Sequence, residues 1–155
     1  MFNSITFKKF SGEKIPDIEE YVKDYMKDNP DLEIMIGTDS QNRGDFTVWS
    51  TVIAMYRPGN GAHCVFKRWK TPRERDMSTR LLSEVSYSIE CAESLVAKGI
   101  KKPTCIDIDI NPTQNGKSNI VFASAKGMVT GMGYEARWKT LGPLVTSVAD
   151  WIVKK

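Results

Sequence analysis

The sequence has few of the features that would place it in a membrane, around a zinc ion or within a disulfide framework. None of its apolar runs approaches the roughly 20 residues needed to cross a bilayer. Its cysteines, Cys64, Cys91 and Cys105, are odd in number and widely spaced, as is typical of reduced thiols. His63 is the only histidine, so neither a zinc site nor a thiol nucleophile activated by histidine is expected. These absences favour a cytoplasmic protein and direct attention to its carboxylates.

The composition is that of an ordinary globular domain. Hydrophobic residues make up 41% and charged residues 26%, which excludes a disordered or collagen-like chain. The formal net charge is only +3. This small excess of basic residues permits a nucleic-acid partner without requiring one. We find no repeat, low-complexity tract or linker. The chain is therefore expected to form one domain over residues 1–155, in which residues 1–30 form an N-terminal arm and helix.

Apolar periodicity and turn residues predict an α/β protein with a mixed five-stranded sheet and helices on both faces. A first helix should stop at Asn29-Pro30, and a long helix should begin with Thr71 as its cap and Pro72 at its first position. The expected strands cover residues 33–39, 46–56, 63–69, 104–110 and 134–138, and the later helices cover residues 118–132 and 144–153. A right-handed crossover should place the strand at 104–110 beside the strand at 33–39, in parallel.

Acidic residues stand where strands of a buried sheet are expected to end. Asp39 ends an otherwise apolar strand, and Asp107 and Asp109 point to one face of the neighbouring strand. If the two strands are adjacent, their carboxylates converge at the sheet edge where α/β proteins bind ligands. Clustered oxygen ligands suit Mg²⁺ or Mn²⁺ better than Zn²⁺. The alternative is that each acid caps a strand or faces water.

Two helices offer further acids. Glu84 lies about 20° from Met77 on a helical wheel, at the rim of the apolar stripe, where it is able to reach over the sheet. The alternative for Glu84 is an ion pair with Arg80, four residues earlier. Asp150 falls roughly opposite the apolar face of the last helix, which favours a solvated side chain.

A basic segment lies between the third expected strand and the long helix. Cations interleaved with an aromatic ring are suited to hold a phosphate backbone and stack a base. An ordinary solvated loop is the alternative. Lys117 follows Gly116 at the start of a later helix, where it is able to touch a phosphate, although the P-loop pattern is incomplete because Asn111 replaces its first glycine. The candidate nucleic-acid contacts are Lys67, Arg68, Trp69, Lys70, Arg73 and Lys117.

Four segments taken together resemble the ribonuclease H-like superfamily, and more closely its YkuK-type family. The resemblance covers most of the chain, from the strand at 33–39 to the terminal helix, and the order and placement of the segments carry it. The segments are Gly37-Thr38-Asp39-Ser40, Arg80-Leu81-Leu82-Ser83-Glu84, Asp109-Ile110-Asn111-Pro112 and Ala149-Asp150.

The resemblance implies a sheet of strand order 3-2-1-4-5 and a carboxylate cluster that binds two Mg²⁺ or Mn²⁺ ions. By position, Asp39 matches the acid of the first strand, Glu84 that of the helix, Asp109 that of the fourth strand and Asp150 that of the last helix. The implied activity is hydrolysis of phosphodiester bonds in RNA, an RNA–DNA hybrid or structured DNA. Asp107 has no counterpart in this set.

Such a nuclease would use Asp39 to bridge the two ions, and Asp109 and Glu84 to hold one each. Asp150 would complete the coordination of the ion that binds the attacking water. An alternative from another class is a catalytically inactive module that keeps the fold and binds nucleic acid or a protein.

Overall fold

The computed structural model describes residues 5–110, 116–138, 149 and 152–154, and it contains a mixed sheet of seven strands. The sheet order is β2-β1-β5-β4-β3-β6-β7. The strands are β1 (Phe7–Lys9), β2 (Lys14–Ile15), β3 (Glu33–Arg43), β4 (Phe46–Arg57), β5 (Gly61–Pro72), β6 (Cys105–Ile108) and β7 (Ala136–Trp138). The helices are α1 (Ile18–Asp28), α2 (Met77–Ala97) and α3 (Gly116–Gly131).

The centre of the sheet is an antiparallel meander of β3, β4 and β5. Gly44, at a φ of 55°, and Asp45 make the tight turn from β3 to β4, because glycine adopts this left-handed conformation without strain. After α2, β6 joins β3 in parallel, and β7 then joins β6 in parallel. The parallel pairing of the strand after the long helix with the first long strand is therefore confirmed.

The prediction of five strands in the order 3-2-1-4-5 is wrong in its count and in its full order. Two short strands, β1 and β2, extend the sheet beyond β5. They contain only three and two residues, too few for alternation to reveal them in the sequence. The remaining five strands, β5-β4-β3-β6-β7, do lie in the order that the resemblance implied.

The long helix begins later than predicted. Residues Thr71 and Pro72 still belong to β5, where they pair with β4, and Thr71 Oγ1 accepts a hydrogen bond from Trp49 Nε1 at 2.8 Å. The cap of α2 is Asp76, whose carboxylate accepts from the Thr79 amide at 2.9 Å. Sheet pairing thus overrides the local Thr-Pro signal for a helix start.

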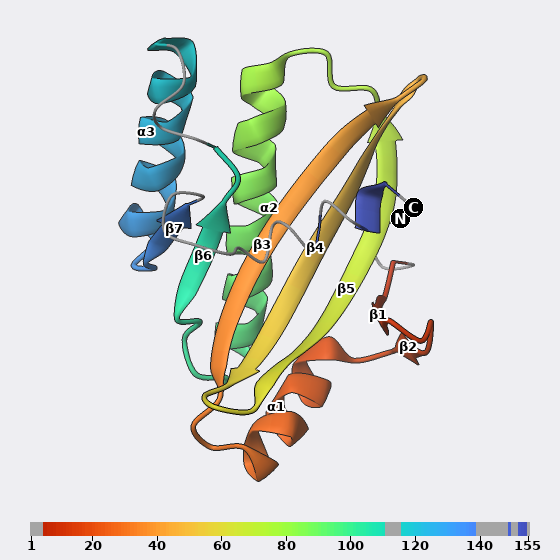
Figure 1. The fold of residues 1–155 in the computed structure, drawn as a ribbon, viewed down its shortest axis with the longest axis vertical. Helices are drawn as coiled ribbons and strands as arrows, with labels where there is room; N and C mark the ends of the chain where they lie inside the picture. Colours follow the sequence, from red (N-terminus) through yellow and green to blue (C-terminus); the bar gives the residue numbers. More distant parts are fainter. Residues whose placement is uncertain (1–4, 111–115, 139–148, 150–151, 155) are drawn as a thin grey trace.

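Helices cover the two faces of the sheet unequally. In Figure 1, α2 lies behind β3, and α3 lies beside α2 next to β6 and β7, while the short helical piece near the C-terminus lies in front of β4 and β5. Because side chains alternate along a strand, Ile53 of β4 joins the core behind the sheet, and Val52 packs in front against Ala149 and Ile152. Most of the predicted helix at 144–153 lies outside the described residues. No helix among those described is long and apolar enough to cross a membrane.

Candidate functional site

Hydroxyl groups fix α2 against the middle of β3. Thr38 Oγ1 lies 2.7 Å from Ser88 Oγ of α2 and 2.8 Å from Thr51 Oγ1 of β4. Ser40 Oγ donates a 2.5 Å hydrogen bond to Glu84 Oε2. Four residues of helix rise about 6 Å and two residues of strand about 6.7 Å, so the two contacts match in spacing. This match positions the Glu84 carboxyl over β3.

Arg80 also contributes to this contact. It does so through Ser40 and not through the direct ion pair with Glu84 that was the alternative from the sequence. Its Nη1 donates to the Ser40 carbonyl at 3.1 Å and to Ser40 Oγ at 2.9 Å. Ser40 therefore accepts from the guanidinium while it donates to the carboxylate. Sequence reasoning did not single out Ser40 or Ser88. The available signal was a small polar residue, Ser88, inside the otherwise apolar stripe of the long helix.

The pairing of β3 with β6 brings the predicted strand acids together. Asp39 is 6% exposed and stands beside Ser50 of β4. Gly37 pairs with Asp107, and the same parallel register continued by two residues places Asp109 beside Asp39. Alternation puts Asp39, Asp107 and Asp109 on the sheet face opposite that of Ser40. Asp109 follows directly after the end of β6, at the strand terminus where the acids were expected to gather.

Glu84 responds to the charges of those aspartates. Its side chain is 3% exposed, and burial raises its pKa well above the ordinary range, with the charges of Asp39 and Asp109 adding to the rise. The hydrogen bond from Ser40 and the charge of Arg80 act in the opposite direction. A cation among the three carboxylates would lower this pKa, because positive charge favours the ionised form. The three elements therefore place their acids within electrostatic reach of one another.

The donor chemistry fits a divalent cation, but the described residues do not close around one. Carboxylate oxygens are ligands of Mg²⁺ and Mn²⁺. Over residues 5–110, 116–138, 149 and 152–154, no three His, Cys, Asp or Glu side chains form a group that could hold a metal ion. Asp150, the fourth predicted ligand, lies outside the described residues. Glu84, Asp39 and Asp109 are thus within electrostatic reach of one another, but among the described residues they do not form a group that could hold a metal ion.

Asp107 occupies a separate, buried position on β6. It is 2% exposed, pairs in register with Arg137 of β7, and its Oδ1 lies 3.8 Å from Cys105 Sγ. Burial and the charge of Asp107 raise the pKa of Cys105 to about 12. The Cys105 thiol therefore stays protonated at neutral pH.

The predicted basic segment belongs to β5 and is divided between the two faces of the sheet. Lys67 and Trp69 point toward α2, whereas Arg68 and Lys70 point to the face of Asp39. Trp69 is 6% exposed, stacked on Trp49 with centroids 6.4 Å apart. Its burial leaves little of the ring exposed to a nucleic-acid base. Trp69 is therefore a core aromatic residue and not the exposed base-stacking residue that the sequence suggested.

The remaining predicted contacts are at the rim of the sheet. Lys70 is exposed, with Nζ 5.8 Å from the centre of the Phe46 ring. Arg73 Nη1 donates to the Gly44 carbonyl at 2.7 Å and so braces the turn between β3 and β4. The side chain of Lys117 lies outside the described residues.

Comparison with known families agrees with this topology. The model of the ribonuclease H-like family matches residues 14–154. The chain therefore belongs to the ribonuclease H-like family. No curated protein matches it. Its closer assignment to the YkuK-type family stays a prediction.

Proposed function

We propose that this protein is a metal-dependent nuclease that hydrolyses phosphodiester bonds of RNA, an RNA–DNA hybrid or structured DNA. The supporting observation concerns the buried Glu84 carboxyl. Its pKa is raised by burial and by the negative charges of Asp39 and Asp109, which come from two neighbouring strands. Membership of the ribonuclease H-like family suggests a nuclease-type function connected with nucleic acid.

In this proposal Asp39, Glu84, Asp109 and Asp150 would hold two Mg²⁺ or Mn²⁺ ions, with Asp39 shared by both, Glu84 and Asp109 contributing to one each, and Asp150 to the ion that binds the attacking water. Bound divalent ions supply an activated water and stabilise the leaving oxygen. Ser40 orients the Glu84 carboxylate through Oε2, and Arg80 holds Ser40 in place. Arg68 and Lys70, on the same face as Asp39, are placed to contact the phosphate backbone.

A cleavage assay tests the proposal. Labelled single-stranded RNA, an RNA–DNA hybrid and a DNA hairpin are incubated with Mg²⁺ or Mn²⁺, with EDTA as the metal-free control. Asp39→Asn should reduce cleavage by about 100-fold or more, since even outer-shell partners of a metal contribute 10–100-fold. Glu90→Gln, an exposed acid on the same helix as Glu84, should leave the rate unchanged. Cleavage that persists in EDTA, or in the Asp39→Asn variant, would contradict the proposal.

A second candidate function is a binding module without catalysis. It is favoured by the absence, among the residues that the structure describes, of three side chains arranged to hold a metal. This candidate predicts salt-sensitive binding of nucleic acid with no cleavage in either metal, and an affinity that Asp39→Asn leaves unchanged.

A further inference from the structure

The hairpin of β1 and β2 concentrates positive charge at one edge of the sheet. Lys8 and Lys14 are direct cross-strand partners, an arrangement that is destabilising for like charges. Between them in sequence, Lys9 points to the opposite face and pairs with Glu13, Nζ to Oε2 at 3.0 Å. The one carboxylate of the hairpin is thus committed to Lys9. Among the described ion pairs, none includes Lys8 or Lys14.

These two lysines line a cavity of about 440 Å³ together with Arg68 of β5, Thr6 and Phe66. None of the described residues that line it is acidic. The Arg68 Nε–H is buried and finds no acceptor within the described part of the chain. Three cations around one cavity, one of them with an unused donor, form a site for an anion with several oxygens.

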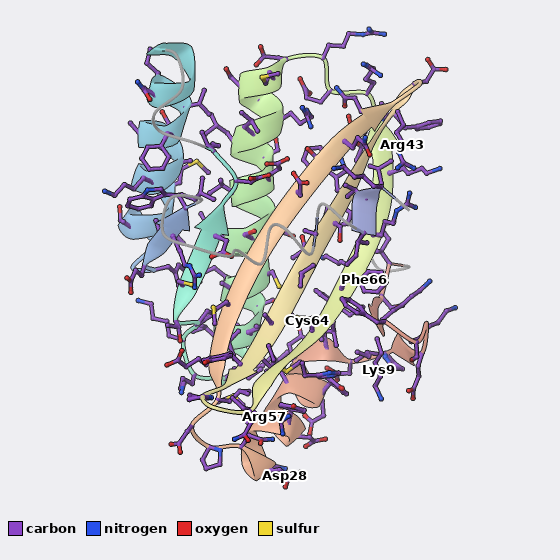
Figure 2. The ribbon with its side chains drawn as sticks, in the orientation of Figure 1. Lys9, Asp28, Arg43, Arg57, Cys64 and Phe66 are labelled. Carbon is purple, nitrogen blue, oxygen red and sulfur yellow. The ribbon has the colours of Figure 1, made fainter. Side chains whose placement is uncertain are left out.

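An aromatic surface adjoins the cations. The Phe66 ring lies 5.6 Å from the ring of Phe10, which is 52% exposed. Figure 2 labels Phe66 on β5 and Lys9 on the neighbouring hairpin, at the same edge of the sheet. Phe66 itself is partly buried, packed against the cluster of Val52, Ala149 and Ile152, while its ring also lines the cavity. Cations beside an aromatic ring are the combination that binds a phosphate backbone and stacks a base.

The cavity opens on the sheet face that carries Asp39 and Asp109, opposite the face of Ser40. Lys14, Lys8 and Phe66 form one cross-strand row, which continues through β4 and β3 to Asp107 of β6. Arg68 lies in the adjacent row, which runs through Ser50 to Asp39. Three steps between neighbouring strands separate β1 from β3, roughly 14 Å.

We propose that Lys8, Lys14, Arg68 and Phe66 form a strand-binding subsite, in which the three cations hold phosphates of a nucleic-acid strand and Phe66 contacts a base. The identity of the ligand rests on the proposed function, whereas the anion chemistry rests on the cavity alone. The cross-strand lysine pair, unfavourable for folding, is retained for this contact.

The test measures binding in EDTA, so that cleavage plays no part. A fluorescent single-stranded oligonucleotide of about twelve nucleotides is titrated with each protein over a range of salt concentrations. The double variant Lys8→Gln/Lys14→Gln should bind more weakly, and its log–log salt slope should fall by about 1.4, that is about 0.7 for each lost contact with a single strand. Arg68→Gln should lower the slope by about 0.7. Lys9→Gln, from the same strand but the opposite face, is the matched control and should bind like the wild type.

Three further measurements separate the subsite from other causes. The thermal midpoint of the double glutamine variant should equal or exceed that of the wild type, because the substitution removes like-charge repulsion. Lys8→Arg/Lys14→Arg should retain binding. A nucleoside monophosphate should compete only weakly; competition as strong as that of the oligonucleotide would indicate a free-nucleotide site and overturn the strand assignment.

Wild-type affinity and salt slope in the double glutamine variant, or an equal loss in Lys9→Gln, would also overturn the subsite. A different result would refute the nuclease proposal: no metal-dependent cleavage, although the binding differences among these variants persist.

Discussion

Glu84 is a buried acid whose neighbours act on its charge in opposite directions. Burial and the charges of Asp39 and Asp109 favour its neutral form, while Ser40 and Arg80 favour its ionised form. Burial has the largest effect, so the folded protein binds a proton at Glu84 more strongly than the unfolded chain does. Folding and cation binding therefore make opposite demands on this carboxyl, because a metal ligand must be deprotonated.

The first prediction concerns stability against pH in EDTA. Because the pKa of Glu84 is raised on folding, its contribution to stability is full below the ordinary value of 4.5 and is lost as the pH rises through the folded value. The slope from this one proton reaches at most about 1.4 kcal/mol per pH unit. Glu84→Gln should flatten the dependence of the unfolding free energy on pH, measured by urea denaturation. Glu90→Gln serves as the control, and a pH profile of the Glu84→Gln variant as steep as that of the wild type would refute the assignment.

At the scale of elements, the contact between α2 and β3 determines where the helix acid lies. Thr38 and Ser40, two residues apart on one face of β3, meet Ser88 and Glu84, one helical turn apart on α2. A shift of α2 by one residue would break both contacts at once. The helix register is thus fixed by buried hydrogen bonds as well as by apolar packing.

The second prediction tests this register. Ser88→Ala leaves the buried hydroxyl of Thr38 with one partner fewer and should lower the free energy of unfolding by about 1–3 kcal/mol. Ser86→Ala, on the exposed side of the same helix, should change it by less than about 0.5 kcal/mol. Urea denaturation of both variants provides the comparison, and equal losses would show that the buried contact contributes nothing of its own.

The third prediction concerns Trp69, which the sequence suggested as a base-stacking residue and the structure places in contact with Trp49 and Tyr87. Trp69→Ala should destabilise the fold by about 3–5 kcal/mol, as for other large core aromatics. Trp69→Phe should fold and bind a single-stranded oligonucleotide with wild-type affinity. A clear loss of affinity in a stably folded Trp69→Phe variant would restore the stacking role.

The sequence reveals the long strands and helices because apolar periodicity needs several residues to become visible. Asp39 could be located because it interrupts an apolar strand, and its nearness to Asp109 followed from the parallel crossover. The start of α2 was mistaken because Thr71-Pro72 satisfies a local helix rule while β4 still pairs with it. The hairpin of β1 and β2 was missed because tertiary pairing, not pattern, makes those few residues strands.

Strand pairing also explains why the basic segment at residues 67–70 is divided between the two faces of the sheet. The sequence hypothesis treated residues 67–70 as one basic cluster, although residues 67–69 already belonged to an expected strand; along β5 they alternate between the core behind the sheet and the face of Asp39. Alternation therefore places Lys67 and Trp69 on the face of α2 and leaves Arg68 and Lys70 on the face of Asp39. The further cations on that face, Lys8 and Lys14, come from the hairpin that the sequence did not reveal.

At the scale of the whole molecule, the ribonuclease H-like sheet separates two regions along one face. The acids of β3 and β6 lie near its centre, and the basic cavity lies at the β1–β2 edge. The C-terminal residues Ala149 and Ile152 pack on the same face over β4. In our account the central acids carry out the chemistry on bound metal ions, and the edge holds the strand.

A crystal soaked in Mn²⁺ and measured for anomalous scattering tests the central claim, that Asp39, Glu84 and Asp109 together hold divalent ions. Anomalous peaks are expected on the order of 2 Å from carboxylate oxygens of all three side chains, and they should be lost in Asp39→Asn crystals soaked alongside. Manganese ordered only elsewhere in the molecule, with these three carboxylates unmoved, would contradict it.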